Sequence, residues 1–123
     1  MKVERIQVGP RMAQAVIHSG IVYLAGQVAT GARGASVAEQ TKNILANIDS
    51  LLSAAKSAKD QILSATIWLT DMNTFSEMNE VWGAWVEPGA PPARAAVGVA
   101  ALASDDFKLE ISVIATQSTS GTS

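Results

Sequence analysis

The first quarter of the chain carries three short stretches rich in apolar residues, a pattern typical of β-strands. Residues 1–8 alternate loosely between apolar and polar, and residues 13–18 and 21–25 are two short apolar runs. Gly9-Pro10 breaks the pattern after the first run, and Ser19-Gly20 separates the other two. Because glycine tolerates the positive φ of tight turns, this arrangement predicts a strand followed by a β-hairpin.

Two longer segments repeat apolar residues every three or four positions, which indicates helices with one buried face. The first opens at Ser36, with Glu39 three positions later as in a capping box. Its apolar positions are Val37, Ile44, Leu45, Ile48, Leu51, Leu52 and Ala55. The second opens at Thr74, with Glu77 in the same spacing, and ends before Pro88-Gly89. Its apolar face carries Met78, Val81, Trp82 and Trp85.

Three further strands are predicted, one at residues 62–69 between the two helices and two after the second helix. The first of these two follows Pro91-Pro92 and ends at Val99, and the other covers residues 107–113. The order β, β, β, α, β, α, β, β predicts an α+β domain of two layers, with both helices packed on one face of a sheet.

The last two strands carry the candidate site. Arg94 shares one face of its strand with Ala96 and Gly98, and Glu110 lies on the polar face of the final strand. If these strands pair with each other antiparallel, Arg94 and Glu110 approach each other on a surface of very small side chains. The sequence therefore predicts a charged pocket with room for a ligand between the two groups.

Composition narrows the function. The chain has 123 residues, which suits a single domain, predicted at 1–116, with a Ser/Thr/Gly-rich tail at 117–123 that we expect to be disordered. The net charge is −2 and the nine basic residues are scattered, which argues against a nucleic-acid surface. The absence of cysteine excludes disulfides, thiolate catalysis and zinc–thiolate sites. No cluster predicts a metal site, and no apolar run has membrane-spanning length, so we expect a soluble cytoplasmic protein.

Several of these residues together resemble one known family. They are Gly9-Pro10, Ala25-Gly26-Gln27, Asn79 in its helix, Pro92-Ala93-Arg94 and the strand Lys108-Leu109-Glu110-Ile111. In this order and spacing they resemble the RidA (reactive intermediate deaminase A) family, also called YjgF/YER057c/UK114. The resemblance spans nearly the whole chain, and the Pro-Ala-Arg and Lys-x-Glu segments are its most specific part.

The resemblance implies a chorismate-mutase-like (bacillar type) fold and a homotrimer in which three sheets form a central barrel. It places the sites in clefts between subunits. It also implies hydrolysis of enamines and imines, such as 2-aminoacrylate, to 2-keto acids and ammonia, without a cofactor. Older labels of the family are endoribonuclease and translation inhibitor.

The resemblance also implies residue roles. Arg94 would bind the substrate carboxylate through its planar guanidinium, and Glu110 would hold and deprotonate the attacking water. Substrate binding is assigned to Arg11, Ala25, Gly26, Asn79 and Ala96. Arg11 stands where typical members have a tyrosine, and Ala96 where they often have a cysteine. Arg11 would make the pocket more cationic and favour a more acidic ligand.

Other interpretations remain open at this stage. Arg94 and Glu110 could form a structural salt bridge that fixes strand register, and Asn79 could bind a strand instead of a ligand. Arg11 could be a solvated loop residue. At the level of function, the alternatives are a non-catalytic trimer that binds small carboxylates, and RNA cleavage following the older label.

Overall fold

The computed structural model describes residues 2–118 as one mixed six-stranded sheet with two helices. The strands lie in the order β1-β2-β3-β6-β4-β5 across the sheet. Their bounds are β1 Glu4–Val8, β2 Ala13–His18, β3 Ile21–Leu24, β4 Ile62–Leu69, β5 Ala93–Gly98 and β6 Leu109–Thr116. Every strand expected from the sequence is present. The final one begins at Leu109, because the buried Phe107 belongs to the preceding loop.

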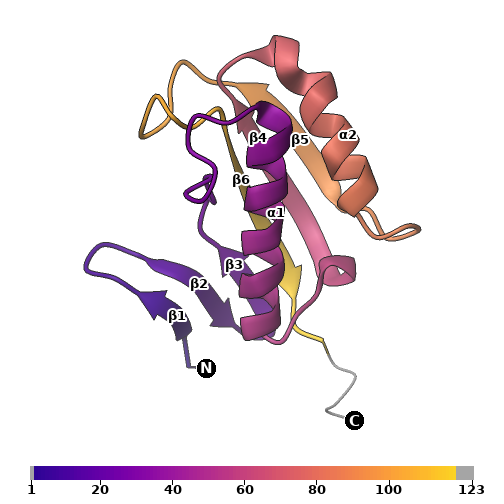
Figure 1. Cartoon of the computed structure of the whole chain (residues 1–123). Helices are drawn as coiled ribbons and strands as arrows, with labels where there is room; N and C mark the ends of the chain where they lie inside the picture. Colours follow the sequence, from indigo (N-terminus) through magenta and orange to yellow (C-terminus); the bar gives the residue numbers. More distant parts are fainter. Residues whose placement is uncertain (1, 119–123) are drawn as a thin grey trace.

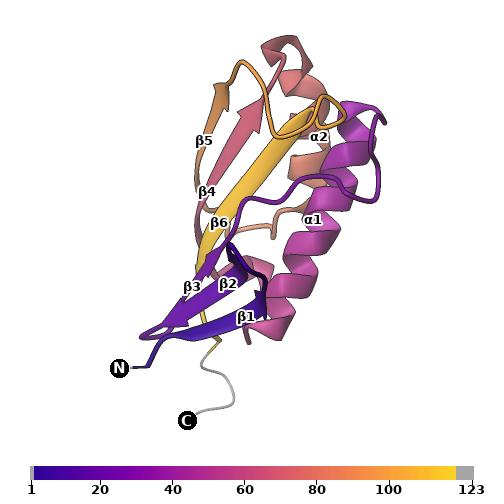
Figure 2. The ribbon, with the colours of Figure 1, turned by 90° about the vertical axis from the view of Figure 1, so that its left-hand side faces the viewer.

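Both helices lie on the same face of the sheet. They are α1, Val37–Ala54, and α2, Phe75–Trp85, and short 3-10 turns, η1 at Lys59–Gln61 and η2 at Met72–Thr74, precede β4 and α2. Figure 1 shows α1 in front of the sheet with α2 beside it, and Figure 2 shows the opposite face of the sheet without any helix. The predicted α+β architecture of two layers is confirmed.

The pairing of the last strands differs from the sequence prediction. β5 and β6 are not neighbours, because β4 lies between them, parallel to β5 and antiparallel to β6. The reason is the connection through α2. A helix that links two strands of one sheet returns the chain parallel to the strand it left, so β5 pairs with β4. β5 is consequently an edge strand, and β6 lies inside the sheet between β3 and β4.

The helix starts confirm one capping prediction and correct the other. The Ser36 side chain accepts a hydrogen bond from the Glu39 amide, as the capping box at α1 predicts. The Thr74 side chain makes no such bond to α2 and instead donates to the carbonyl of Asp71, the residue before η2. Glu77 accepts a hydrogen bond from the Ala38 amide at 2.8 Å, so it caps the N-terminus of α1 from the neighbouring helix.

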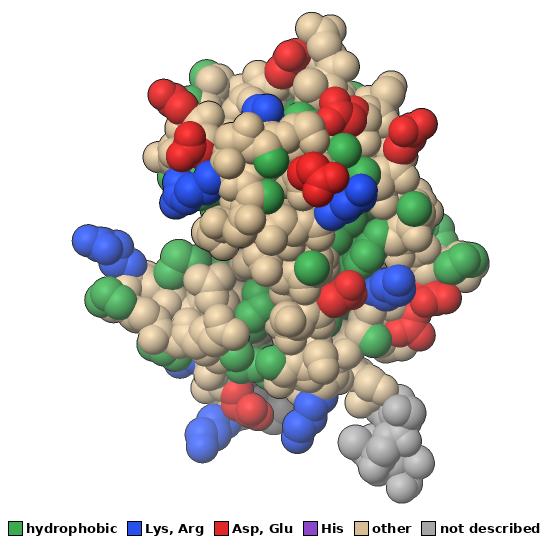
Figure 3. Space-filling view, in the orientation of Figure 1, with side chains coloured by type: hydrophobic (Ala, Val, Ile, Leu, Met, Phe, Trp, Pro, Cys, Tyr) green, Lys and Arg blue, Asp and Glu red, His purple; other side chains and the backbone are tan. Residues whose placement is uncertain are grey.

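The outer side of the helix layer carries both signs of charge. Figure 3 shows basic and acidic side chains interspersed over this face, with no basic stripe across it. Among residues 2–118, no helix is long and apolar enough to cross a membrane.

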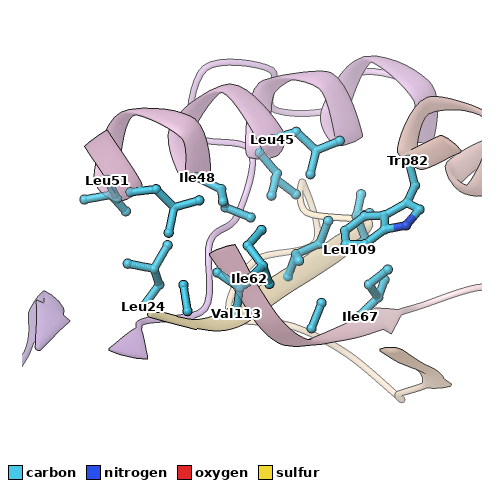
Figure 4. Close-up of a cluster of buried hydrophobic side chains, with 14 of the residues drawn as sticks. Leu24, Leu45, Ile48, Leu51, Ile62, Ile67, Trp82, Leu109 and Val113 are labelled. Carbon is cyan, nitrogen blue, oxygen red and sulfur yellow. The ribbon is translucent and has the colours of Figure 1, made fainter. Parts of the chain in front are cut away.

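The core fills the space between α1, α2 and the covered face of the sheet. Figure 4 shows Leu45, Ile48 and Leu51 of α1 above Leu24, Ile62 and Val113 of the strands, with Trp82 of α2 above Ile67 and Leu109. All of these side chains are buried. The apolar stripes predicted for both helices therefore face the sheet, and each large side chain adds roughly 1.5–3 kcal/mol of burial free energy.

One polar side chain is completely buried within this layer and ties α1 to the start of β6. Gln40 of α1 is 0% exposed. Its Nε2 donates to the carbonyls of Ala35 and Asp106, at 3.2 and 2.7 Å, and its Oε1 accepts from the Lys108 amide at 2.9 Å. All three of these hydrogen bonds go to loop backbone, so Gln40 fixes the segment that leads into Glu110.

The end of the described chain is attached to the body of the domain. The Gln117 amide donates to the Gly20 carbonyl, and the Ser118 amide donates to the Lys56 carbonyl. The rest of the predicted tail, 119–123, lies outside the described residues, as does residue 1.

We predict that Gln40→Met lowers the free energy of unfolding by about 2–4 kcal/mol, since the substitution removes three hydrogen bonds and takes the partner away from the Ala35 carbonyl and the Lys108 amide. The matched control is Gln61→Met, which removes one hydrogen bond, accepted from Thr116, at a partly exposed site and should cost about 1 kcal/mol. Chemical denaturation at a fixed protein concentration measures both values. Equal losses for the two variants would contradict the role assigned to Gln40.

Candidate functional site

Arg94 lies at the edge of the sheet, beneath α2. In the parallel pairing of β5 with β4 it is opposite Ala65, whose side chain faces the helices. Its Nη1 donates a hydrogen bond to Oδ1 of Asn79 at 2.7 Å. The guanidinium carbon lies 5.4 Å from the centre of the Trp82 ring and 5.7 Å from that of Phe75, within the range of cation–π attraction. The helix thus orients the guanidinium without neutralising it.

No acidic group pairs with Arg94 in the part of the chain that the structure describes. The side-chain ion pairs found there join Arg33 to Asp106 and Lys42 to Glu39. Only one of the five guanidinium N–H groups of Arg94 is used, in the bond to Asn79. The others remain available, and the side chain is exposed. Arg94 therefore has the charge and the donors to bind an anion.

Glu110 lies on the opposite face of the sheet, the face without helices. It is opposite Trp68 in the pairing of β6 with β4, while its neighbours Leu109 and Ile111 face the core. Its carboxylate lies directly against Gly26. A Cβ placed on Gly26 would come within 2.8 Å of the Glu110 Cδ and nearer still to Oε2. The carboxylate occupies space that only a glycine leaves open.

The predicted meeting of Arg94 and Glu110 does not occur within one chain. With β4 between their strands, the two backbones are about 10 Å apart across the sheet. The side chains also leave it on opposite faces, as the pairing of Arg94 with Ala65 and of Glu110 with Trp68 shows. This result also excludes an Arg94–Glu110 salt bridge within the chain.

Ala25 and Gly26 differ in what they offer a ligand. The Ala25 amide donates to the Gln14 carbonyl at 2.9 Å, and its own carbonyl accepts from the Gln27 side chain. The Gly26 amide, in contrast, makes no hydrogen bond to any other described residue. Of these two residues assigned to substrate binding, only Gly26 has a backbone amide that is free to contact a ligand.

Of the remaining candidate residues, two lie beside Arg94 and one lies in a turn. Asn79 bonds Arg94, and Ala96 shares the helix-facing side of β5 with it. Arg11 is exposed in the turn between β1 and β2, which the bond from the Gly9 amide to the Met12 carbonyl closes. We call Arg94, Asn79 and Ala96 the arginine cluster, and Glu110 with Gly26 the glutamate cluster.

Sequence analysis missed two features of these clusters. Trp82 was expected only on the apolar face of its helix and Phe75 was given no role, yet both rings flank the Arg94 guanidinium. The available signal was the spacing of Phe75, Asn79 and Trp82, which places all three on one helix face. The second feature is the contact between Gly26 and Glu110. A glycine next to a strand does not indicate in the sequence which side chain packs against it.

The two clusters offer complementary chemistry. A guanidinium binds a carboxylate through parallel, charge-assisted hydrogen bonds. A carboxylate next to a free backbone amide can hold a water molecule and accept its proton. Within residues 2–118 no group of three or more His, Asp or Glu side chains could hold a metal ion.

Comparison with known proteins identifies the family. The family model described as Endoribonuclease L-PSP matches residues 4–117. A RutC family protein of Haemophilus influenzae is 40% identical over 116 residues, covering 94% of this chain and 99% of that protein. The RutC family protein YoaB of Escherichia coli is 40% identical over 115 residues, covering 94% and 98%.

Solved structures agree with the sequence relatives. NMB1025 of Neisseria meningitidis, a member of the YjgF protein family, has a TM-score of 0.92 and 39% identity, covering 96% of this chain and 97% of that one. YyfA of Yersinia pestis, of the Rid protein family, has a TM-score of 0.82 and 33% identity, covering 89% and 90%. The resemblance seen in the sequence is confirmed, and the chain belongs to the Endoribonuclease L-PSP family, whose relatives carry the names RutC, YjgF and Rid.

Proposed function

We propose that the protein hydrolyses small imino acids, and the enamines in equilibrium with them, to 2-keto acids and ammonia. The observation that carries this proposal is Arg94, an oriented guanidinium without an acidic partner among the described residues. Such a group favours a substrate with a carboxylate. The carboxylate of Glu110 beside the free amide of Gly26 supplies the second requirement, a place for water.

The reaction needs little beyond binding and proton transfer. Arg94 binds the substrate carboxylate, and Glu110 accepts a proton from water as its oxygen forms a bond to the imine carbon. The same proton then passes to the nitrogen of the resulting carbinolamine. Cleavage of the carbon–nitrogen bond, as Glu110 takes the proton of the carbinolamine hydroxyl, releases ammonia and leaves the keto acid. A protonated imine is already electrophilic, so positioning the water supplies much of the rate gain.

The site requires two copies of the chain in this proposal. Arg94 and Glu110 leave one sheet on opposite faces, so a single substrate can contact both only if a second copy contributes one of them. We propose that the assembly is a homotrimer with the arginine cluster of one copy facing the glutamate cluster of the next. Arg11, at the exposed turn, would reach the same cleft and favour acidic substrates.

The uncovered face of the sheet supports such an assembly. Tyr23 and Val97 point toward it, and they are 46% and 43% exposed. Trp68 and Ile114 share this face and are only half-buried. An apolar sheet face of this kind is stabilised when another surface covers it.

RNA cleavage, the activity in the family description, has less support. The net charge of −2 and the mixed charges of Figure 3 do not favour a phosphate backbone. A trimer that binds small carboxylates without turnover would use the same Arg94, and the assay below separates it from an enzyme.

The first prediction from this proposed function concerns Arg94. A pyridoxal-phosphate enzyme generates 2-aminoacrylate or a longer imino acid, and keto-acid release is followed with and without the protein. We expect acceleration by the unmodified protein and a loss of at least about a hundredfold in kcat/KM for Arg94→Ala, since a charge-assisted contact is removed. Arg33→Ala is the matched control, because it removes an exposed arginine whose contacts are the Asp106 carboxylate and the Phe107 ring.

The outcomes of this assay separate the candidate functions. Acceleration that is lost in Arg94→Ala and kept in Arg33→Ala supports the deaminase. No acceleration with any imino acid, together with thermal stabilisation by small carboxylates, would favour the binding protein. Degradation of RNA that depends on Arg94 would favour the nuclease.

The second prediction concerns Gly26. Gly26→Ala should displace the Glu110 carboxylate, because the new Cβ occupies its position. The flexible side chain of Glu110 can move away, so we expect the free energy of unfolding to change by no more than about 1 kcal/mol. We expect kcat to fall about tenfold or more, since the displaced carboxylate no longer aligns the water. Gly83→Ala, at an open helical position, is the control. An unchanged kcat in Gly26→Ala would contradict the role of this contact.

The third prediction tests the shared site. Arg94→Ala and Glu110→Gln are each expected to be inactive, but a mixed assembly would contain sites with Arg94 from one variant and Glu110 from the other. After unfolding and refolding at equal amounts, we expect about a quarter of the normal activity if copies mix at random. A mixture that stays inactive although mixed assemblies form would contradict a site built from two copies.

A further inference from the structure

A cavity lies beside α1 on the helix side of the sheet, and no residue of the arginine cluster lines it. It has a volume of about 430 Å³ and lies between α1, the β1–β2 hairpin and the segment 26–30. Figure 3 shows the molecule hollowed beside the projecting hairpin. Its lining residues are Gln7, Met12, Gln14, Gly26, Gln27, Val28, Thr30, Asn47, Ser50 and Leu51. This volume is within the range of small-molecule sites.

The walls of this cavity are polar but uncharged. Four of the lining residues carry side-chain amides and two carry hydroxyls, whereas none carries a charge. An ion would lose hydration there without meeting an opposite charge, which disfavours anions and cations alike. We call this space the amide cavity.

The orientation of two of its amides follows from their hydrogen bonds. Gln27 is 8% exposed, and its side chain bonds the Ala25 carbonyl at 3.0 Å and Gln14 Oε1 at 2.9 Å. A backbone carbonyl can only accept, so the group of Gln27 that faces Ala25 is the NH₂. The same NH₂ meets the oxygen of Gln14, and the bond thereby orients the second amide as well.

This arrangement leaves one acceptor and one donor group unused. They are Oε1 of Gln27 and Nε2 of Gln14, neither of which bonds another described residue. Within residues 2–118 no buried side-chain oxygen or nitrogen lacks a partner, so both atoms reach solvent, and both residues line the cavity. They offer a ligand a fixed donor and a fixed acceptor within one hydrogen-bonded pair of side chains.

We propose that the amide cavity binds a small uncharged compound with a carboxamide or ureide group. Such a group carries an acceptor and a donor side by side and so complements Gln14 and Gln27. A carboxylate presents only acceptors, and an ammonium only donors. Asn47, Ser50 and Thr30 can each donate or accept and would satisfy the rest of the ligand. The proposal does not rest on the deaminase activity.

The test uses the full isotope-labelled chain and three probes of the same length: glutaramide, glutarate and pentane diamine. The side-chain amide signals of Gln14, Gln27 and Asn47, assigned from single variants, are followed by NMR. We expect glutaramide to shift these signals saturably and the two charged probes to leave them in place. The absence of a saturable shift up to the solubility of glutaramide, or equal shifts with glutarate, would overturn the proposal.

Variants locate the binding. Gln14→Leu and Asn47→Leu should each weaken glutaramide binding about tenfold, the effect of one lost hydrogen bond in a partly buried site. Asn47→Leu keeps the Gln14–Gln27 pair intact, so it still tests the cavity if Gln14→Leu does not fold. Gln61→Leu, outside the cavity, should bind like the unmodified protein. Unchanged binding in Asn47→Leu and in every folded Gln14→Leu sample would overturn the proposal.

Discussion

The position of β4 between β5 and β6 is the constraint on which the candidate site depends. Because the connection through α2 returns the chain parallel to β4, β5 becomes an edge strand and β6 stays inside the sheet. Arg94 and Glu110 are thereby separated across β4 and directed to opposite faces. Neither charge can neutralise the other within the chain, so both keep their capacity to act on a bound molecule.

Leaving a guanidinium without a carboxylate costs little at the edge of a sheet, where water can hydrate it. The Asn79 oxygen and the rings of Phe75 and Trp82 restrict its orientation without cancelling its charge. A group fixed before binding loses less conformational entropy when a ligand arrives. The core residue Trp82 thus contributes to packing and to the orientation of Arg94 at once, which links the stability of α2 to the site.

The sequence predicted local structure well and strand neighbours poorly. Alternation and helical spacing depend on each residue's own environment, so the strands, both helices and the faces of Arg94 and Glu110 on their strands could be read directly. Pairing between strands depends on the path of the whole chain, and two strands joined by one loop suggested an antiparallel pair that the helical crossover overrides. Gln40 can be noticed in the sequence as a polar residue within the apolar stripe of α1. Its three hydrogen-bond partners lie in loops, however, and only the folded chain brings those loops to it.

Two glycines show the same difference between what the sequence predicts and what only the folded chain reveals. Gly20 has a φ of +78° and is needed for its backbone conformation, which a turn pattern predicts. Gly26 is absent from the positive-φ glycines and is needed for space, since the Glu110 carboxylate occupies the place of a side chain. It also lines the amide cavity. Gly26 therefore separates the amide cavity from the Glu110 carboxylate. A ligand in the cavity that moves the backbone at Gly26 must also change the surface against which the carboxylate packs.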